Sequence, residues 1–263
     1  MKITNRHNLP APLYRTICWA VEKYEGPRAR AVLDEERISV TTLVNPPRLT
    51  LLRAVHEDDL EIDASELLYL VTGIAFHFMM AEVGWTEEES DHLIEKRIDR
   101  SHNGWIVSGQ FDVLGLRGKT ISDWKWTSIW SVVTPKFEWV AQLNLYRWLA
   151  KAEGYDIDTL ETWAMLRDWS VSKVAKDPRL PVIPFAELQQ ATWDDPVTEG
   201  YIDARLALYD EAVSVVRASG NPNAVPVCMD EERWLRKGKN VRCQDYCDVA
   251  QFCAFGATLK KNP

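Results

Sequence analysis

Hydrophobic and polar positions change period along the chain, and these changes predict both helices and strands. Helical patterns cover residues 14–24, 64–83, 87–97, 136–154 and 194–219. The pattern over 64–83 is apolar on most sides and opens at the capping-type residues Asp63 and Ser65, so we expect a long buried helix there. The pattern over 136–154 predicts an amphipathic helix that ends at Gly154.

Strand-like patterns lie between these helices. Residues 105–128, "WIVSGQFDVLGLRGKTISDWKWTS", read as two strands joined by a turn at "LRGK", and residues 159–171 contain another strand. Residues 37–52 predict a short strand or turn before a helix. The order predicts an α/β (α+β) fold with a central mixed β-sheet flanked by helices and a helical, cysteine-rich C-terminal periphery. We expect one domain over residues 1–263, with its core at about 38–175 and a C-terminal helix and cysteine region at about 194–263.

Composition and charge narrow the class of protein. The chain has 263 residues, 46% of them hydrophobic and 27% charged, which argues against a disordered or collagen-like protein. A net charge of −8 argues against a nucleic-acid binder that is basic throughout. However, residues 54–94 hold eleven acids and no Lys or Arg, so the rest of the chain is mildly basic. The net charge therefore does not exclude DNA as a partner.

The N-terminal residues show no apolar signal-peptide core. The longest apolar stretch, residues 67–81, is interrupted by Thr72, Gly73 and His77 and is too short to span a bilayer. We therefore expect a soluble, intracellular (cytoplasmic) protein without membrane partners.

The cysteines are unevenly placed. Cys18 stands alone, whereas Cys228, Cys243, Cys247 and Cys253 follow the spacing C-x14-C-x3-C-x5-C near the end of the chain. In an intracellular protein this clustering favours a thiolate-ligated metal or iron–sulfur site over a disulfide framework; the alternative is four buried small hydrophobic residues. Three close thiolates and one distant thiolate suit an iron–sulfur cubane better than zinc, which favours C-x2-C pairs.

Two acids and a lysine fall close together in the predicted hairpin. Asp112 ends its first strand, and Asp123 and Lys125 alternate on one face of its second strand. Neighbouring carboxylates repel each other unless a cation bridges them, and their oxygens suit Mg²⁺ or Mn²⁺. A lysine beside them can position a water molecule or stabilise charge on a phosphate. The alternative is a solvated strand face with alternating charges.

Further residues extend this pattern. His77 lies in the apolar helix, and Gln142 and Tyr146 are four residues apart in the helix after the hairpin. The chain thus contains G-x3-H, G-x2-D, D-x-K and Q-x3-Y in that order. From about residue 38 to 253, this order resembles the RecB-like branch of the PD-(D/E)XK nuclease superfamily. That branch includes CRISPR-associated and AddB-type nucleases with a 4Fe–4S cluster.

The resemblance implies a restriction-endonuclease-like core and a role for each motif residue. His77, Asp112, Asp123 and the backbone carbonyl of Trp124 would bind Mg²⁺ or Mn²⁺. Lys125 would assist the attacking water, and Gln142 and Tyr146 would contact DNA or support the site. It also implies a 4Fe–4S cluster, with zinc the alternative occupant. Its fourth ligand is Cys228 or Cys18. We favour Cys228, because the tail then supplies all four cysteines and "CMDEERW" resembles phage-type members.

Two other features bear on DNA. Five basic residues and no acid occur from residue 233 to 242. They either lie in a solvated loop or contact DNA phosphates: Arg233, Arg236, Lys237, Lys239 and Arg242. Five of the twelve tryptophans lie near the predicted site: Trp124, Trp126, Trp130, Trp139 and Trp148. We expect most of them to pack in the core, and the alternative role is stacking on DNA bases.

The sequence therefore predicts a divalent-metal-dependent DNA nuclease with a structural iron–sulfur cluster. We expect an exonuclease that acts on DNA ends or single strands in recombination, repair or phage DNA processing, with a second copy or a recombination protein as possible partners. The alternative is a DNA-binding subunit of a recombination complex whose nuclease-like site is mainly structural. A redox protein is a third interpretation, which leaves the two acids and Lys125 unexplained.

Overall fold

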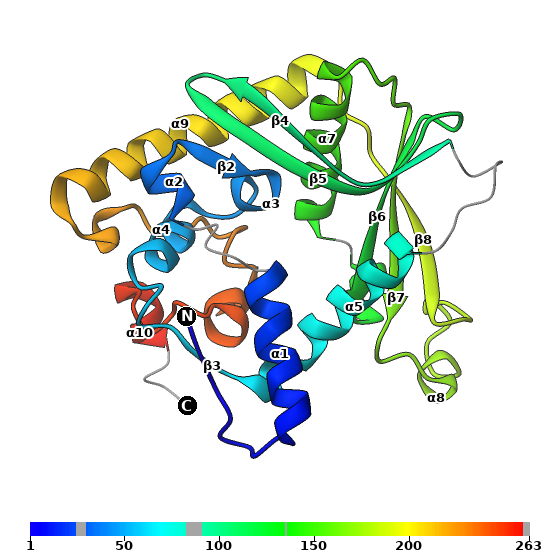
Figure 1. Ribbon diagram of the computed structural model, residues 1–263, viewed down its shortest axis with the longest axis horizontal. Helices are drawn as coiled ribbons and strands as arrows, with labels where there is room; N and C mark the ends of the chain where they lie inside the picture. The colour runs from blue at the N-terminus through cyan, green and yellow to red at the C-terminus, as the bar shows by residue number, and fades with distance from the viewer. Residues whose placement is uncertain (25–29, 83–90, 135, 260–263) are drawn as a thin grey trace. The chain divides into compact units, whose positions relative to one another are not determined.

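The computed structural model describes residues 1–24, 30–82, 91–134 and 136–259. The chain divides into two compact units, each built from discontinuous segments (Figure 1). Unit 1 comprises residues 1–67, 101–107 and 201–263, and unit 2 comprises residues 68–100 and 108–200.

Unit 2 is built on a mixed β-sheet. The strands of this sheet are β4 (His92–His102), β5 (Trp105–Gly115), β6 (Thr120–Thr127), β7 (Thr159–Leu166) and β8 (Phe185–Gln190), and the residues of β4 and β5 within 101–107 count with unit 1. β4 pairs with β5, β5 runs antiparallel to β6, β6 parallel to β7, and β7 antiparallel to β8. The sheet confirms the predicted mixed topology, and β5 and β6 form the predicted hairpin.

Helices cover both faces of this sheet. They are α5 (Leu68–Glu82), α6 (Trp130–Val133), α7 (Phe137–Ala152) and α8 (Val171–Val174). Gln142 of α7 contacts Asp123, whereas the Phe76 ring of α5 packs edge-on against Trp124, 5.7 Å away between ring centroids. Because adjacent strand residues point to opposite faces, α7 and α5 lie on opposite sides of β6.

The burial of these two helices differs from the sequence prediction. α7 is buried on most sides and carries fully buried Leu143, Leu145 and Leu149, so it is a core helix rather than an amphipathic one. α5 was expected to be buried, yet none of its residues is, and Tyr69, Phe78 and Met79 are more than half exposed. An apolar composition on all sides predicts burial, but the described sheet covers only one side of α5.

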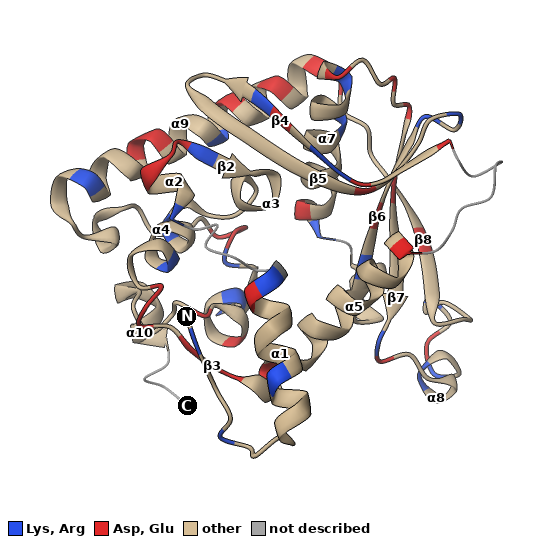
Figure 2. Cartoon of the chain, in the orientation of Figure 1, with Lys and Arg blue, Asp and Glu red and all other residues tan. Residues whose placement is uncertain are grey.

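α5 carries almost no charged side chains (Figure 2). In the part of the chain that the structure describes, residues 64–82 form the one helical stretch long and apolar enough to cross a membrane by length and composition alone. The apolar stretch 67–81, which was expected to be too short to span a bilayer, lies inside this 19-residue helical stretch. One such stretch is weak evidence of a membrane span, because core helices of soluble proteins meet the same criterion.

The predicted helix over residues 87–97 is wrong where the structure describes it. Residues 92–97 belong to β4, and residues 87–90 lie outside the described residues. A two-residue turn, Asn103-Gly104, joins β4 to β5, and both residues have positive φ angles, +48° and +81°. Asn-Gly is the preferred pair for a type I′ hairpin turn, so the sequence held a strand signal here.

Unit 1 combines short helices and strands from the N-terminal part of the chain with elements from the C-terminal part. Its N-terminal part contains β1 (Lys2–Thr4), α1 (Ala11–Tyr24), α2 (Ala31–Asp34), β2 (Arg37–Ser39), α3 (Val40–Leu43), α4 (Pro47–Val55), β3 (Glu61–Asp63) and the 3-10 turn η1 (Ala64–Leu67). β1 pairs with β3 in parallel, and the Ile106 amide at the start of β5 donates to the carbonyl of Glu36 beside β2. The predicted helix at 14–24 is confirmed as α1, and the predicted strand-then-helix at 37–52 as β2, α3 and α4.

The C-terminal part of unit 1 follows α9 (Asp195–Ser219), which begins in unit 2 and confirms the long helix predicted at 194–219. Short elements follow: η2 (Pro222–Ala224), β9 (Leu235–Arg236), β10 (Lys239–Asn240), the π-helical turn η3 (Arg242–Tyr246) and α10 (Ala254–Leu259). β9 and β10 form a small antiparallel hairpin. The tail is therefore irregular, as predicted.

Candidate functional site

The motif residues predicted from the sequence converge in unit 2. They come from four elements: His77 from α5, Asp112 from β5, Asp123 and Lys125 from β6, and Gln142 and Tyr146 from α7. Asp112 lies three residues inside β5 rather than at its end, which corrects the predicted position.

The hairpin register brings the two acids together. Val113 pairs with Ser122, which leaves Asp112 and Asp123 one step further along the two strands. Both carboxylates are buried, and Asp112 Oδ2 accepts a 2.6 Å hydrogen bond from the backbone amide of Trp124. This contact sets Asp112 against the Asp123–Trp124 segment of β6, and the two acids also interact through their charges, as the hairpin prediction expected.

His77 reaches this pair together with an acid that sequence reasoning missed. Its Nδ1 lies 3.1 Å from Oε1 of Glu95 in β4 and 3.5 Å from Oδ1 of Asp112. Ligand atoms of His77, Glu95 and Asp112 lie within 4.8 Å of one another, close enough to hold one metal ion. One imidazole and two carboxylates suit Mn²⁺ or another divalent ion that accepts both nitrogen and oxygen ligands.

Glu95 was missed because its segment was interpreted as a helix. It has a positive φ of +50° inside β4, a conformation that costs a non-glycine residue energy and that is found often at functional sites. Its Oε2 accepts a 2.5 Å hydrogen bond from Gln110 Nε2, and Gln110 Oε1 accepts a 2.7 Å bond from Arg97. The Asn-Gly turn was the signal that would have placed Glu95 on a strand beside Asp112.

Asp123 takes part in a second group, on the side of α7. Lys125 Nζ lies 2.7 Å from Asp123 Oδ2, which confirms that the two side chains share a face. Gln142 Nε2 donates to Asp123 Oδ1 at 3.0 Å and lies 2.9 Å from the hydroxyl of Tyr146, while Lys125 Nζ lies 3.3 Å from Gln142 Oε1. In the structure, therefore, Gln142 and Tyr146 support Asp123 and Lys125.

The buried charges alter the protonation of the site. Burial, followed by the charge of Asp123, raises the pKa of Asp112 to about 7. Burial lowers the pKa of His77, but the hydrogen bond to Glu95 and the charge of Asp112 outweigh it and raise that pKa overall. Burial likewise lowers the pKa of Lys125, and the charges of Asp123 and Asp112 raise it overall, so Lys125 is held as a cation. The site therefore has an excess of acid that a divalent cation would neutralise.

The glycine of the G-x2-D motif has a packing role. A Cβ atom on Gly109 would lie 2.5 Å from Leu149 Cδ1 and 3.0 Å from Tyr146 Cδ1 of α7. Glycine at this position lets β5 and α7 approach closely enough to set Tyr146 beside the acids. Gly73 of the G-x3-H motif differs, because a Cβ there would meet nothing within 4 Å.

Most of the tryptophans near the site pack in the interior. Trp124, Trp139 and Trp148 are buried, and the Trp124 ring stacks on Trp163 of β7 at a centroid distance of 6.1 Å. Trp126 and Trp130 are 36% and 50% exposed and remain candidates for base stacking. The carbonyl of Trp124 stays a predicted ligand.

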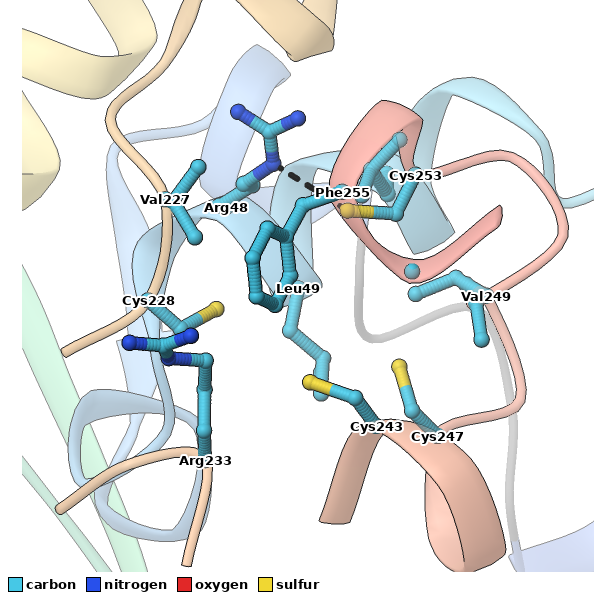
Figure 3. Close-up of a pocket in the computed structure, with 13 residues that line it drawn as sticks. Arg48, Leu49, Val227, Cys228, Arg233, Cys243, Cys247, Val249, Cys253 and Phe255 are labelled. Carbon is cyan, nitrogen blue, oxygen red and sulfur yellow. Dashed lines mark hydrogen bonds between the residues drawn. The ribbon is translucent and has the colours of Figure 1, made fainter. Parts of the chain in front are cut away.

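The four C-terminal cysteines surround one pocket in unit 1 (Figure 3). Cys243 and Cys247 come from η3 and the residue after it, Cys253 precedes α10, and Cys228 lies on the segment after η2. Apolar side chains such as Leu49 and Phe255, together with the cations Arg48 and Arg233, complete the lining. Cys18 belongs to α1 and does not line this pocket. The structure thus groups Cys228, and not Cys18, with the other three.

The thiols of the cysteine pocket are partly buried, which affects their pKa values. Burial, followed by the charge of Glu232, raises the pKa of Cys228 to about 12, and burial also raises the pKa of Cys243 and Cys247. Thiolates on one tetrahedral zinc ion lie about 3.8 Å apart, given a Zn–S bond of about 2.3 Å. In the described part of the chain, no three cysteine sulfurs lie within 4.8 Å of one another. In the described residues, therefore, no three of these sulfurs lie as close together as the thiolates of one zinc ion.

The five basic residues predicted to contact DNA divide into two groups. Arg233 pairs with Asp230 and lies over the Phe255 ring, and Arg242 lies over the Trp234 ring and donates to Asn45. Lys239 pairs with Asp245 at 3.0 Å. Arg236 and Lys237 are exposed at the β9–β10 hairpin, where they remain available to phosphate.

Comparisons with known proteins establish the fold but no family. No family model matches the chain, and no curated protein matches it. The chain is similar to a solved structure named SSO0001, with 16% identity and a TM-score of 0.54, over 91% of this chain and 95% of the other. At this identity the similarity shows a shared fold alone.

Proposed function

We propose that the protein is a divalent-metal-dependent DNA nuclease of the RecB-like type, an exonuclease that acts on DNA ends or single strands in recombination, repair or phage DNA processing. The observation that carries the proposal is the convergence of His77, Glu95 and Asp112 beside the Asp123–Lys125 pair. If Asp123 and Lys125 formed only a structural ion pair, the structure would need neither the histidine nor two further carboxylates beside it.

Each residue has a task in phosphodiester hydrolysis. His77, Glu95 and Asp112 would hold the divalent ion, with Asp123 next to them. When bound, that ion polarises the scissile phosphate and makes a nearby water more acidic. The Lys125 ammonium, oriented by Asp123 and Gln142, donates a hydrogen bond to the attacking water or to a phosphate oxygen as negative charge develops. Tyr146 holds Gln142 in place through their hydrogen bond.

The proposal includes a 4Fe–4S cluster on Cys228, Cys243, Cys247 and Cys253, which would fold the C-terminal tail rather than do redox chemistry. The four thiols on one mainly apolar pocket support it. An intracellular, cytoplasmic location accords with reduced cysteines and belongs to the same proposal.

The deciding experiment is a digestion assay on end-labelled linear DNA with Mn²⁺ or Mg²⁺. We expect cleavage by the wild-type protein and none by Asp123→Ala. Asp156→Asn is a matched control, because Asp156 is an exposed acid of unit 2 paired with Lys119 at 2.5 Å, and it should cleave like the wild type. Equal cleavage by the wild type and Asp123→Ala would refute the assignment. DNA binding without cleavage in either metal would favour the structural subunit instead.

A further inference from the structure

Arg48 places a buried positive charge in the cysteine pocket. It lies in α4, is 4% exposed, and donates from Nε to the sulfur of Cys253 at 3.4 Å (Figure 3). The sulfur of Cys253 is therefore hydrogen-bonded to a buried cation.

The remaining donors of Arg48 go to neutral acceptors. Nη1 donates to the carbonyl oxygens of Asn223, at 3.1 Å, and Val225, and Nη2 donates to the Asn223 side chain at 2.7 Å. Within the described residues, no carboxylate lies at salt-bridge distance from Arg48. A guanidinium stays protonated in proteins, and a buried charge without a counter-charge is costly.

A second buried arginine in unit 1 shows how this protein otherwise meets that cost. Arg205 is 6% exposed and, like Arg48, donates to backbone carbonyls, those of Leu43 and Asn45. It also pairs with Glu232 at 2.9 Å. Arg48 also donates to backbone carbonyls, but it contacts a cysteine sulfur where Arg205 contacts a carboxylate. The counter-charge of Arg48 should therefore come from the cysteine pocket.

The surroundings of Arg48 also fix the position of Cys253. Asn223, which Arg48 holds, donates from Nδ2 to the Phe252 carbonyl at 2.9 Å and accepts from the Ala254 amide at 2.8 Å. The residues on both sides of Cys253 are therefore tied to the same side chain.

We propose that Arg48 is the counter-ion and positioning residue for an anionic iron–sulfur cluster bound by the four tail cysteines, an inference that rests on the proposed cofactor. The guanidinium offsets the negative charge of the thiolate-bound cluster, and its Nε–H bond orients the Cys253 sulfur. Because reduction adds one more negative charge, Arg48 stabilises the reduced state and raises the reduction potential.

The test compares full-length variants reconstituted anaerobically with ferric iron, sulfide and a thiol reductant, which supplies the electrons that the mixed-valence cluster requires. Reduction potentials are measured by dithionite titration of the visible absorbance, and cluster stability by the rate of absorbance loss to an iron chelator. We expect Arg48→Met to have a more negative potential and to lose its cluster about tenfold faster than the wild type. Arg48→Lys keeps the charge and should restore part of both effects.

Arg53→Met is the matched control. Arg53 lies on the same helix, but it is half-exposed and pairs at 2.8 Å with Asp248, the residue that follows Cys247. Its loss should leave the potential and the loss rate close to those of the wild type. Equal values for wild type and Arg48→Met, or equal shifts in Arg48→Met and Arg53→Met, would overturn the proposal.

Two further outcomes are decisive. If Arg48→Met does not fold, Arg48→Lys carries the comparison, since it lacks the Nε–H bond to sulfur; a loss rate equal to that of the wild type would then refute the positioning role. If the wild type takes up no iron and sulfide, the cofactor and this role of Arg48 are both wrong. The nuclease proposal is tested separately, by cleavage with Mn²⁺.

Discussion

The acidic site of unit 2 and the cysteine pocket of unit 1 differ in how their ligands are held. His77, Glu95 and Asp112 project from a helix and two paired strands, and hydrogen bonds from Gln110 and the Trp124 amide fix both carboxylates. The cysteines come instead from short turns and connecting segments of the tail, where few regular backbone bonds define the shape.

Their charges are balanced in opposite ways. The acidic site gathers negative groups and has one lysine, so under the proposal it would be completed by a cation. The cysteine pocket gathers thiols beside a buried arginine, so under the proposal it would be completed by an anion. A site on a rigid sheet can keep its geometry without its ligand, whereas a tail of short turns depends on the bound group for its fold. The comparison therefore predicts that a substitution in one site leaves ligand binding at the other unchanged. It also predicts that loss of the ligand destabilises the tail but not the sheet.

Removing a cysteine ligand should have the largest effect. Cys247→Ser should abolish the iron–sulfur absorbance and lower the melting temperature by several degrees or more, because the cluster would stabilise the tail. Mn²⁺ binding at the acidic site should persist, as measured by calorimetry. Cys18→Ala is the control, and it should keep the absorbance. If Cys18→Ala lost the absorbance and Cys228→Ala kept it, the fourth ligand would be Cys18 rather than Cys228.

Glu95→Gln should produce an intermediate effect, confined to the acidic site. Replacing one anionic oxygen ligand by a neutral amide should weaken Mn²⁺ binding about ten- to a hundredfold, by analogy with the loss of groups around other metal sites. Iron content should not change. Glu187→Gln, an exposed acid on β8, is the control and should bind Mn²⁺ normally. Unaltered Mn²⁺ affinity in Glu95→Gln would remove Glu95 from the ligand set.

The two motif glycines should give the smallest effects, of opposite sign. Gly109→Ala should lower the free energy of unfolding by about 1–3 kcal/mol, because its Cβ would overlap Leu149 and Tyr146. Gly73→Ala should raise it by up to about 1 kcal/mol, because the helix gains a better helix former in open space. Urea denaturation measures both. Equal changes at the two positions would show that the close approach of β5 and α7 is unimportant.

The local sequence determined more of unit 2 than its motifs alone suggest. The alternation in residues 105–128 was enough to place Asp123 and Lys125 on one face, and the four-residue spacing put Gln142 and Tyr146 on one side of a helix. These relations follow from the backbone geometry of one strand and one helix, so they do not depend on the rest of the fold. The spacing of the tail cysteines similarly marked a common site.

Tertiary structure decided which of these groups meet. Glu95 became part of the acidic site only because β4 pairs with β5, and its positive φ angle cannot be read from local propensity. The exposure of α5 and the burial of α7 depend on which sides the sheet covers, which composition does not specify. Arg48 and Cys253 are 205 positions apart, and only the fold brings a guanidinium to that sulfur. Local sequence sets the direction of a side chain within its element, but contacts between elements depend on long-range packing.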